Sequence, residues 1–188
     1  MTDETDMIKK SYAGIGARKT PSLVLQDMNG IGAILRNKGY VLRSGGAKGA
    51  DQAFEKGSAQ LELGLKMQKE IYIPWSGFNG YDDNAPGIIN AESLDNYKEA
   101  QVIAKTFHPA WKNLSSTAKK FHSRNVYQVL GLSLKDPSDF IVCWTPDGKA
   151  SGGTGQAIRI GKAYGATIYN LNSDYQPMWG YLWYYHYQ

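Results

Sequence analysis

The chain passes from an apolar run through glycines into a helix start within one short stretch, Val41-Leu42-Arg43-Ser44-Gly45-Gly46-Ala47-Lys48-Gly49-Ala50-Asp51. Gly45, Gly46 and Gly49 permit positive φ angles and a close approach of the backbone to a ligand. A helix that opens near Ala50 would aim unpaired N–H groups and the positive end of its dipole at this turn. The stretch therefore predicts a site for an anion such as a phosphate, although a plain tight connection between a strand and a helix has the same pattern.

Two further glycine turns lie near the ends of the chain, Tyr12-Ala13-Gly14-Ile15-Gly16-Ala17-Arg18 and Ser151-Gly152-Gly153-Thr154-Gly155-Gln156. None of the three turns is a Walker A motif or a full G-x-G-x-x-G, so no single turn is specific. Ligands of open α/β sheets bind outside the carboxyl ends of the strands, where the strand order reverses. The three turns are therefore predicted to converge on one phosphate site.

Short apolar segments alternate with segments of helical period along the chain. Strands are predicted at residues 11–15, 40–42, 70–74, 139–144 and 167–171. Helices are predicted at residues 21–38, 50–66, 93–105, 110–130 and 151–164, the first with Thr20 as N-cap and Pro21 as its first helical residue. This alternation predicts an α/β fold, a Rossmann-like open parallel sheet of about five strands with helices on both faces.

The chain has 188 residues, which predicts a single domain. We expect a flexible lead-in at residues 1–10, a nucleotide-binding domain at residues 11–174 and an aromatic tail at residues 175–188. The tail holds seven aromatic side chains, more than a solvated terminus is expected to expose, which favours a homo-oligomer or closure against the domain.

Composition narrows the class of protein. No apolar run approaches the length of a membrane span, and the acidic residues near the N-terminus, Asp3, Glu4 and Asp6, do not suit a secretory signal. The single cysteine, Cys143, cannot form an internal disulfide. These features favour the cytoplasm, and no pattern in the sequence predicts a metal or a cofactor.

Positive charge is concentrated in residues 105–135, which hold six Lys or Arg and no Asp or Glu. This stretch carries +6, and because the whole chain carries +4 the remainder sums to −2. Such a patch attracts phosphates or nucleic acid, although a solvated lysine-rich helix face has the same composition.

Two other features suggest parts of a ligand site. Residues 75–91 form a long predicted loop in which Trp75, Phe78 and Tyr81 could stack on a base or pack the loop against the domain. The predicted helix at residues 110–130 places Asn125 on an otherwise apolar stripe, beside Arg124. That asparagine either satisfies backbone groups in the core or lines a polar pocket.

The three turns resemble the signature segments of the SLOG superfamily, the Rossmann-like group that contains the DNA-processing protein DprA/Smf and the LOG phosphoribohydrolases. The resemblance rests on residues 14–18, 44–51 and 152–159 and spans roughly residues 12–171. The segment His122-Ser123-Arg124-Asn125-Val126-Tyr127-Gln128-Val129-Leu130-Gly131 is similar to the compact DprA-like proteins often carried by bacteriophages, which implies the cytoplasm of a bacterial host.

The resemblance implies a nucleotide or nucleic-acid phosphate at the turns, with charge from Arg18 and Lys48. The full set of candidate ligand-binding residues is Gly14, Gly16, Ala17, Arg18, Ser44, Gly45, Gly46, Lys48, Asp51, Trp75, Arg124, Asn125, Trp144, Gly153, Thr154, Gly155 and Arg159. LOG enzymes carry a glutamate where this chain has Arg159, as in the corresponding DprA segment. The resemblance therefore leans away from an enzyme and names no catalytic residue.

Three functions remain open from the sequence. The first is a binding protein for a nucleoside phosphate, an ADP-ribose-like molecule or a cyclic nucleotide signal, acting as a sensor or a sequestering sponge. The second is a DprA-like protein that binds single-stranded DNA. The third is a nucleotide N-glycosidase in which Asp82, Asp83 or Glu92 replaces the absent glutamate.

Overall fold

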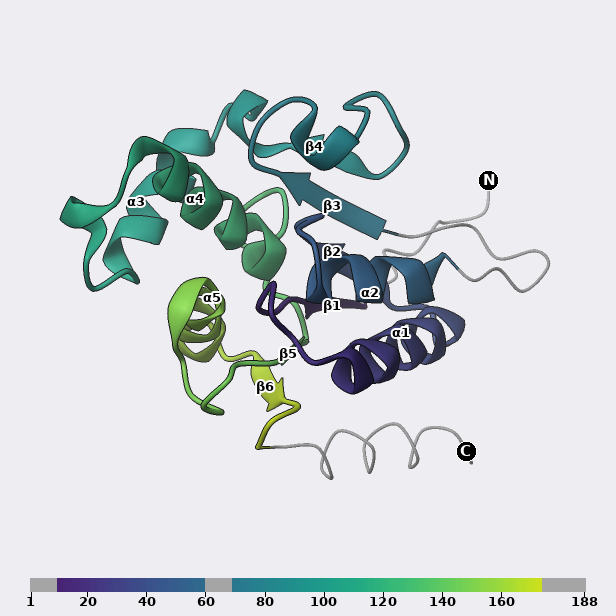
Figure 1. Cartoon of the computed structure of the whole chain (residues 1–188). Helices are drawn as coiled ribbons and strands as arrows, with labels where there is room; N and C mark the ends of the chain where they lie inside the picture. The colour runs from purple at the N-terminus through teal and green to yellow at the C-terminus, as the bar shows by residue number, and fades with distance from the viewer. Residues whose placement is uncertain (1–9, 60–68, 174–188) are drawn as a thin grey trace.

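The computed structural model describes residues 10–59 and 69–173, which form an α/β fold around one parallel sheet (Figure 1). Six strands lie in the order β4-β3-β2-β1-β5-β6 within these residues. The strands are β1 (Ser11–Gly14), β2 (Val41–Ser44), β3 (Lys69–Ile73), β4 (Ile88–Asn90), β5 (Phe140–Cys143) and β6 (Thr167–Asn170). The helices are α1 (Ser22–Asn37), α2 (Ala50–Ser58), α3 (Tyr97–Thr106), α4 (Ser116–Leu130) and α5 (Gly152–Ala163), with short 3-10 turns η1 (Phe78–Gly80), η2 (Ala91–Ser93) and η3 (Trp111–Asn113). The predicted Rossmann-like class is confirmed, with one strand more than expected.

Helices cover both faces of the sheet and divide the core into two layers. On one face α1 and α2 pack against the strands through residues such as Met28, Leu35 and Phe54. On the other face α3, α4 and α5 pack through residues such as Val126 and Ile158. Figure 1 shows these two groups of helices on opposite sides of the strands.

The strands supply both layers because side chains alternate between the faces of a sheet. In β5, Phe140 and Val142 join the layer under α1 and α2, while Ile141 and Cys143 join the layer under α3, α4 and α5. All four are buried, which is why this strand reads as a continuous apolar run in the sequence.

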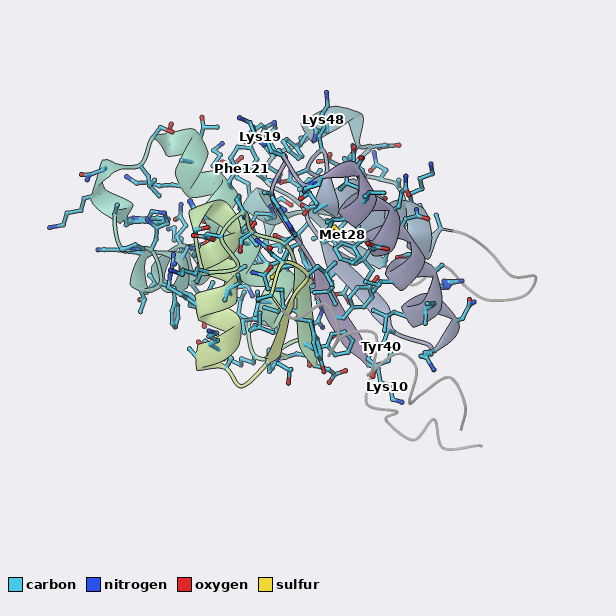
Figure 2. All side chains as sticks on the ribbon, turned by 60° about the horizontal axis from the view of Figure 1, so that its bottom comes forward. Lys10, Lys19, Met28, Tyr40, Lys48 and Phe121 are labelled. Atoms are coloured by element: carbon cyan, nitrogen blue, oxygen red, sulfur yellow. The ribbon has the colours of Figure 1, made fainter. Side chains whose placement is uncertain are left out.

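The order in which strands are added to the sheet reverses between β1 and β5. The chain adds β2, β3 and β4 outward on one side of β1, and then returns to pair β5 with the other side of β1 in parallel. Figure 2 shows Lys19, Lys48 and Phe121 near one end of the molecule, and Lys10 and Tyr40 at the opposite end. Lys10 and Tyr40 precede β1 and β2, so the first group marks the end where the strands finish.

Some predicted elements differ from the observed ones. The predicted loop at residues 75–91 contains η1 and the edge strand β4, which pairs with β3. A strand of three residues next to glycine and proline gives too short an alternation to be recognised from sequence. The predicted helices at residues 93–105 and 110–130 begin later than expected, as α3 and α4, because the 3-10 turns η2 and η3 precede them.

The first helix also begins differently from the prediction. Pro21 is the N-cap of α1, and Thr20 does not cap it. The Thr20 hydroxyl instead donates to the Ala17 carbonyl at 2.7 Å, which closes the turn after β1. Residues 1–9 of the predicted lead-in at residues 1–10, the end of the predicted helix at residues 60–66 and the aromatic tail lie outside the described residues.

A buried arginine joins three parts of the chain beside the sheet. Arg43 in β2 is 2% exposed, and its Nε donates to Glu70 Oε2 in β3 at 2.9 Å. Its Nη1 donates to the Asp136 carbonyl at 2.6 Å, before β5. A cation buried this deeply needs such partners, so the role of Arg43 is structural.

No helix in the described part of the chain is long and apolar enough to cross a membrane.

Candidate functional site

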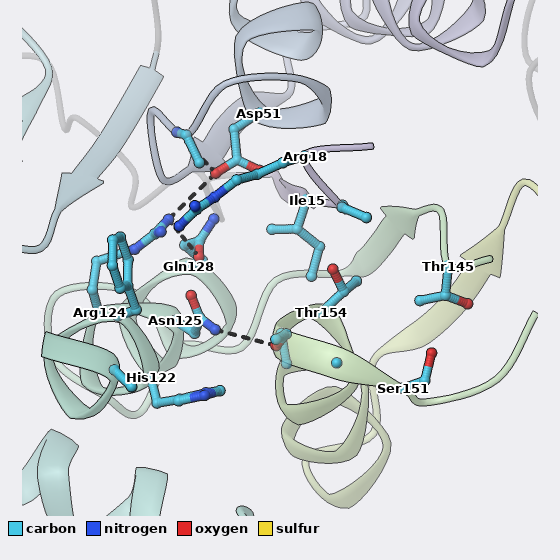
Figure 3. Close-up of a pocket in the computed structure, with 18 of the residues that line it drawn as sticks. Ile15, Arg18, Asp51, His122, Arg124, Asn125, Gln128, Thr145, Ser151 and Thr154 are labelled. Atoms are coloured by element: carbon cyan, nitrogen blue, oxygen red, sulfur yellow. Dashed lines mark hydrogen bonds and ion pairs between the residues drawn. The ribbon is translucent and has the colours of Figure 1, made fainter. Parts of the chain in front are cut away.

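A pocket of about 450 Å³ opens where β1 and β5 end, at the point where the strand order reverses (Figure 3). Its walls come from the turn after β1, the start of α2, one face of α4, the segment after β5 and the start of α5. The lining residues are Ile15, Gly16, Ala17, Arg18, Ala47, Asp51, Ala118, Phe121, His122, Arg124, Asn125, Gln128, Thr145, Pro146, Ser151, Gly152, Gly153, Thr154 and Ala157. This is the position in which open α/β sheets bind ligands.

Two guanidinium groups flank one aromatic ring in this wall. The Cζ atom of Arg18 lies 5.5 Å from the centre of the Phe121 ring, and that of Arg124 lies 6.0 Å from it. Arg18 is exposed and forms no ion pair with a described residue. Its cation–π contact with Phe121 orients the side chain while leaving its N–H donors available.

The second guanidinium is already engaged. Arg124 is 4% exposed; its Nη1 donates to Gln128 Oε1 at 3.0 Å and lies 3.4 Å from Asp51 Oδ2 (Figure 3). Burial raises the pKa of Asp51, although Arg124 and the Ala47 amide oppose this rise. Burial also lowers the pKa of Arg124, which Asp51 partly offsets. Both pKa shifts result from desolvation, which the Arg124–Asp51 contact at 3.4 Å offsets only in part. The guanidinium of Arg124 stays charged because its ordinary pKa is so high.

The pocket therefore holds an excess of positive charge. Arg18 and Arg124 face one carboxylate, Asp51, which is paired with Arg124. The charge left without a partner among the described lining residues is that of Arg18. A polar cleft with this balance attracts an anion.

The N-terminus of α5 adds backbone donors to the same pocket. The first three amides of α5, those of Gly152, Gly153 and Thr154, donate to no described acceptor, and the first helical hydrogen bond runs from the Gly155 amide to the Ser151 carbonyl at 2.8 Å. A Cβ at Gly152 or Gly153 would meet no atom within 4 Å, so this backbone borders open space. Unpaired amides and the positive end of a helix dipole together favour a bound anion.

Polar side chains of α4 and α5 form a network beside these donors. Gln156 is fully buried, and its Nε2 donates to the Ala104 carbonyl at 3.0 Å. Its Oε1 lies 2.8 Å from His122 Nδ1 and 3.4 Å from Asn125 Nδ2. Asn125 Nδ2 also lies 3.3 Å from the Gly153 carbonyl, which it can reach as a donor (Figure 3). The network fixes the start of α5 against α4.

Burial lowers the pKa of His122, and nearby His108, Arg124 and Arg159 lower it further, while Gln156 opposes the shift. The His108 ring packs against the His122 ring with their centres 4.3 Å apart. His122 is therefore neutral at neutral pH.

The structure brings eight of the predicted residues to the pocket. They are Gly16, Ala17, Arg18, Asp51, Arg124, Asn125, Gly153 and Thr154. Of the two interpretations of Asn125, the structure places this side chain at a polar pocket wall.

The other predicted residues do not line this pocket, and most of the turn after β2 is covered by the chain itself. Asn79 Nδ2 donates to the Gly46 carbonyl at 2.9 Å, and a Cβ at Gly46 would lie 2.6 Å from the Tyr81 ring. The Ser44 hydroxyl donates to the Gly14 carbonyl at 2.6 Å and is fully buried. Residues 75–91 fold back over this turn, which a pattern local to residues 41–51 does not contain.

The remaining predicted residues have packing or anchoring roles. Trp75 packs edge-on against Phe121, and Trp144 packs into the layer under α1 and α2. Arg159 donates from Nε to the Phe107 carbonyl at 2.8 Å and from Nη1 to the Ala150 carbonyl at 2.9 Å. The residues outside the lining are Gly14, Ser44, Gly45, Gly46, Lys48, Trp75, Trp144, Gly155 and Arg159.

The carboxylates considered as catalytic replacements also lie away from the lining. Asp83 accepts from the Gly77 amide at 3.1 Å and from Asn90 Nδ2 at 3.2 Å. Glu92 pairs with Lys120 at 2.6 Å, and Asp82 is exposed and accepts from the Asn84 amide. Among residues 10–59 and 69–173, no cluster of His, Cys, Asp or Glu has the arrangement of a metal site.

The candidate residues predicted from the sequence did not include several lining residues, among them Phe121, His122, Gln128, Thr145 and Ser151. Phe121, Asn125 and Gln128 lie on one face of α4 because they are three or four residues apart. If Asn125 is taken as a pocket residue, this spacing also predicts that Gln128 lines the pocket. Thr145 directly follows the predicted strand at residues 139–144 and lies two residues after β5, so its place at the carboxyl end of the sheet could also be predicted from the pattern.

Comparisons with known proteins show the fold and no family. No family model matches the chain, and no curated protein matches it. Among solved structures it is similar to DNA processing protein A from Helicobacter pylori, which was solved in a study of its single-stranded DNA binding mode. The TM-score is 0.56 at 16% identity, and the match covers 86% of this chain and 64% of that one. The chain therefore spans less than two thirds of that protein's length and shares a DprA-like fold with it.

Proposed function

We propose that this protein binds a nucleotide-type ligand in the pocket between β1 and β5, with its phosphate between Arg18 and the start of α5. The observation that carries this proposal is the coincidence of one unpaired guanidinium and three unpaired amides at one pocket. Charged donors and helix N-termini are the usual partners of a phosphate. The neutral His122 and the Asp51–Arg124 pair leave this positive charge uncompensated.

The rest of the pocket suits the remainder of a small nucleotide. Its volume of about 450 Å³ lies within the range of small-molecule sites. Ile15, Ala118, Phe121 and Ala157 give it apolar surface beside the polar groups. A sensor or a sequestering sponge needs only this binding, without turnover.

The first experiment is mass spectrometry of small molecules released by denaturing the purified protein, since a tightly held nucleotide would co-purify. Calorimetric titration with AMP and with inorganic phosphate then measures binding directly. We expect AMP to bind wild-type protein and to bind Arg18→Ala more weakly. The absence of both a released nucleotide and AMP binding would refute the proposal.

A second candidate function is binding of single-stranded DNA. The cations of α4 and the segment before it favour it: Lys119 lies over the Trp111 ring at 5.9 Å, and Lys105, Lys112 and Trp111 border a hollow beside α3. Stacking of bases on aromatic side chains beside cations is a mode of single-strand recognition. The DprA-like fold of the described residues is compatible with this candidate.

Salt dependence separates the two candidates. Binding of an oligo-dT strand should weaken steeply as salt rises, because several phosphates displace counterions. Binding of AMP within the pocket should respond less. A Lys112→Ala/Lys119→Ala variant should lose affinity for the strand and keep affinity for AMP, whereas equal losses would place both ligands on one surface.

Homo-oligomerisation is a separate part of the proposal. It rests on the seven aromatic residues between 175 and 188, which lie outside the described residues. Sedimentation of a chain truncated after Ser173 tests it. An unchanged sedimentation coefficient, corrected for mass, would remove this part of the proposal.

A further inference from the structure

The amide of Gln156 controls which nitrogen of His122 carries the proton. Gln156 Nε2 donates to the Ala104 carbonyl at 3.0 Å, so its Oε1 is the atom presented to His122. An amide oxygen accepts hydrogen bonds and cannot donate them. His122 Nδ1, at 2.8 Å from this oxygen, must therefore carry the hydrogen.

The other ring nitrogen is left as an acceptor. A neutral imidazole has one N–H and one lone pair, so protonation at Nδ1 leaves the lone pair on Nε2. No described residue donates a hydrogen bond to His122 Nε2, and His122 lines the pocket. Asn125 Oδ1 lies on the same pocket wall and also receives no hydrogen bond from a described residue.

The pocket thus has two chemically different regions. Arg18 and the amides at the start of α5 are donors, and they suit an anion. His122 Nε2 and Asn125 Oδ1 are acceptors, and they suit an O–H or N–H group. At a pH of about 8 inorganic phosphate has a single O–H group, and that group is on the anion itself, whereas a nucleotide offers ribose hydroxyls and base N–H groups away from its phosphate.

We propose that His122 is a specificity-determining residue whose Nε2 accepts a hydrogen bond from an O–H or N–H group on the nucleoside part of the ligand. This inference rests on the proposed function. According to this inference, His122 distinguishes a nucleotide from a bare phosphate. Arg18 cannot do so, because its partner, the phosphate group, is common to both ligands.

The surroundings keep His122 in the accepting state. The groups that face its ring are His108, Gln156, Arg124 and Arg159, and the three that carry or can carry positive charge disfavour a second proton on the ring. Asp51 is the described carboxylate in the pocket, and it is paired with Arg124. Protonation at Nε2 would convert the acceptor into a donor and abolish the proposed contact.

Two variants separate the two nitrogens of the ring. In His122→Asn the amide nitrogen can take the place of Nδ1 and keep the contact with Gln156, but no atom replaces Nε2. In His122→Gln the longer side chain can place its amide oxygen near the position of Nε2. Titrations of both variants use AMP, ribose 5-phosphate and inorganic phosphate at a pH of about 8, where histidine is neutral. Thermal unfolding of each variant reports whether the fold is kept.

For His122→Asn we expect a loss of AMP affinity of about threefold to tenfold, the size of one neutral hydrogen bond, and unchanged affinity for inorganic phosphate. His122→Gln should keep most of the AMP affinity. A parallel loss for ribose 5-phosphate assigns the donor to a ribose hydroxyl, and a loss confined to AMP assigns it to the base. Equal AMP affinity in wild type and His122→Asn would overturn the inference while the proposed function stands.

Nitrogen NMR gives an independent readout, since the chain has only three histidines. We expect His122 Nδ1 to be protonated and Nε2 unprotonated in the free protein. The Nε2 resonance should shift on addition of AMP and stay in place on addition of inorganic phosphate. An Nε2-protonated ring in the free protein would also overturn the inference, and failure of wild type to bind either AMP or phosphate would overturn both this inference and the proposed function.

Discussion

The guanidinium of Arg124 lies directly against the backbone of Gly45, so that a Cβ added at Gly45 would fall 1.0 Å from Arg124 Nη1. The contact joins the turn after β2 to the pocket face of α4. The same Cβ would lie 2.8 Å from Asp51 Oδ2, the partner of Arg124. The absence of a side chain at Gly45 therefore makes room for a buried ion pair of the protein itself.

The first prediction follows from this contact. Gly45→Ala should displace Arg124 from Asp51 and Gln128, at a cost of about 1–3 kcal/mol in the free energy of unfolding, the usual range for overpacking. Urea unfolding measures it. In an Arg124→Ala background the same Gly45→Ala change should cost less, because the clashing atoms are gone. Equal costs in the two backgrounds would show that the contact does not govern the effect.

The second prediction concerns two cations that both follow glycine turns. Arg18→Ala should weaken AMP binding on the order of 10- to 100-fold, the size of one charge-assisted hydrogen bond. Its stability should stay close to that of wild type, since Arg18 forms no ion pair with a described residue. Lys48→Ala is the matched control, because Lys48 is exposed and outside the lining. Calorimetry that found the larger loss in Lys48→Ala would move the phosphate to the turn after β2.

The third prediction compares two glycines at the start of α5. Gly153→Ala should fold normally, since its Cβ meets no atom within 4 Å, yet weaken AMP binding because the methyl group occupies space beside the unpaired amides. Gly155→Ala should instead lower stability by about 1–3 kcal/mol, because its Cβ would lie 2.4 Å from the Ala150 backbone. Thermal unfolding and calorimetry on both variants check this contrast. Full AMP affinity in Gly153→Ala would place the ligand away from this turn.

The fourth prediction is a dependence of stability on pH. The pKa values of His122 and His108 are both lowered from the ordinary 6.5, chiefly by burial. Below about pH 6.5 the unfolded chain therefore binds more protons than the folded one, so stability falls as pH falls and levels off above that value. His122→Asn should reduce this slope between pH 6.5 and about pH 5. Parallel curves for wild type and variant would exclude His122 as a source.

The fifth prediction concerns turnover. Asp82, Asp83 and Glu92 lie outside the pocket lining, and Asp51, which lies in it, is held by Arg124, so the described lining offers no unpaired carboxylate to stabilise positive charge on a ribose. AMP should be recovered intact after long incubation with the protein. Chromatography would reveal adenine if this is wrong, and loss of that release in Asp51→Asn would identify the carboxylate responsible.

The sequence by itself determined the fold class and the end of the sheet at which the pocket lies. Buried parallel strands such as β5 are apolar on both faces, so each is a continuous apolar run that can be predicted from its own residues. The edge strand β4 was not predicted, because its three residues are too few to show an alternating pattern. Arg18, Asn125 and Thr154 could be predicted because each stands at a strand end, at a helix start or on one helix face, and all three positions follow from local spacing.

Only the tertiary structure decided which glycine turn stays open. The turns at residues 44–49 and 151–155 have similar local patterns, but Tyr81, Asn79 and Arg124 fill the space beside the first. These side chains come from 30 or more residues further along the chain, so the sequence of the turn itself does not predict them. The tautomer of His122 is decided in the same way, because it depends on a carbonyl of α3 that orients Gln156 in α5. Spacing along the chain predicts which groups reach the pocket, whereas packing between distant segments decides which of them remain unpaired there.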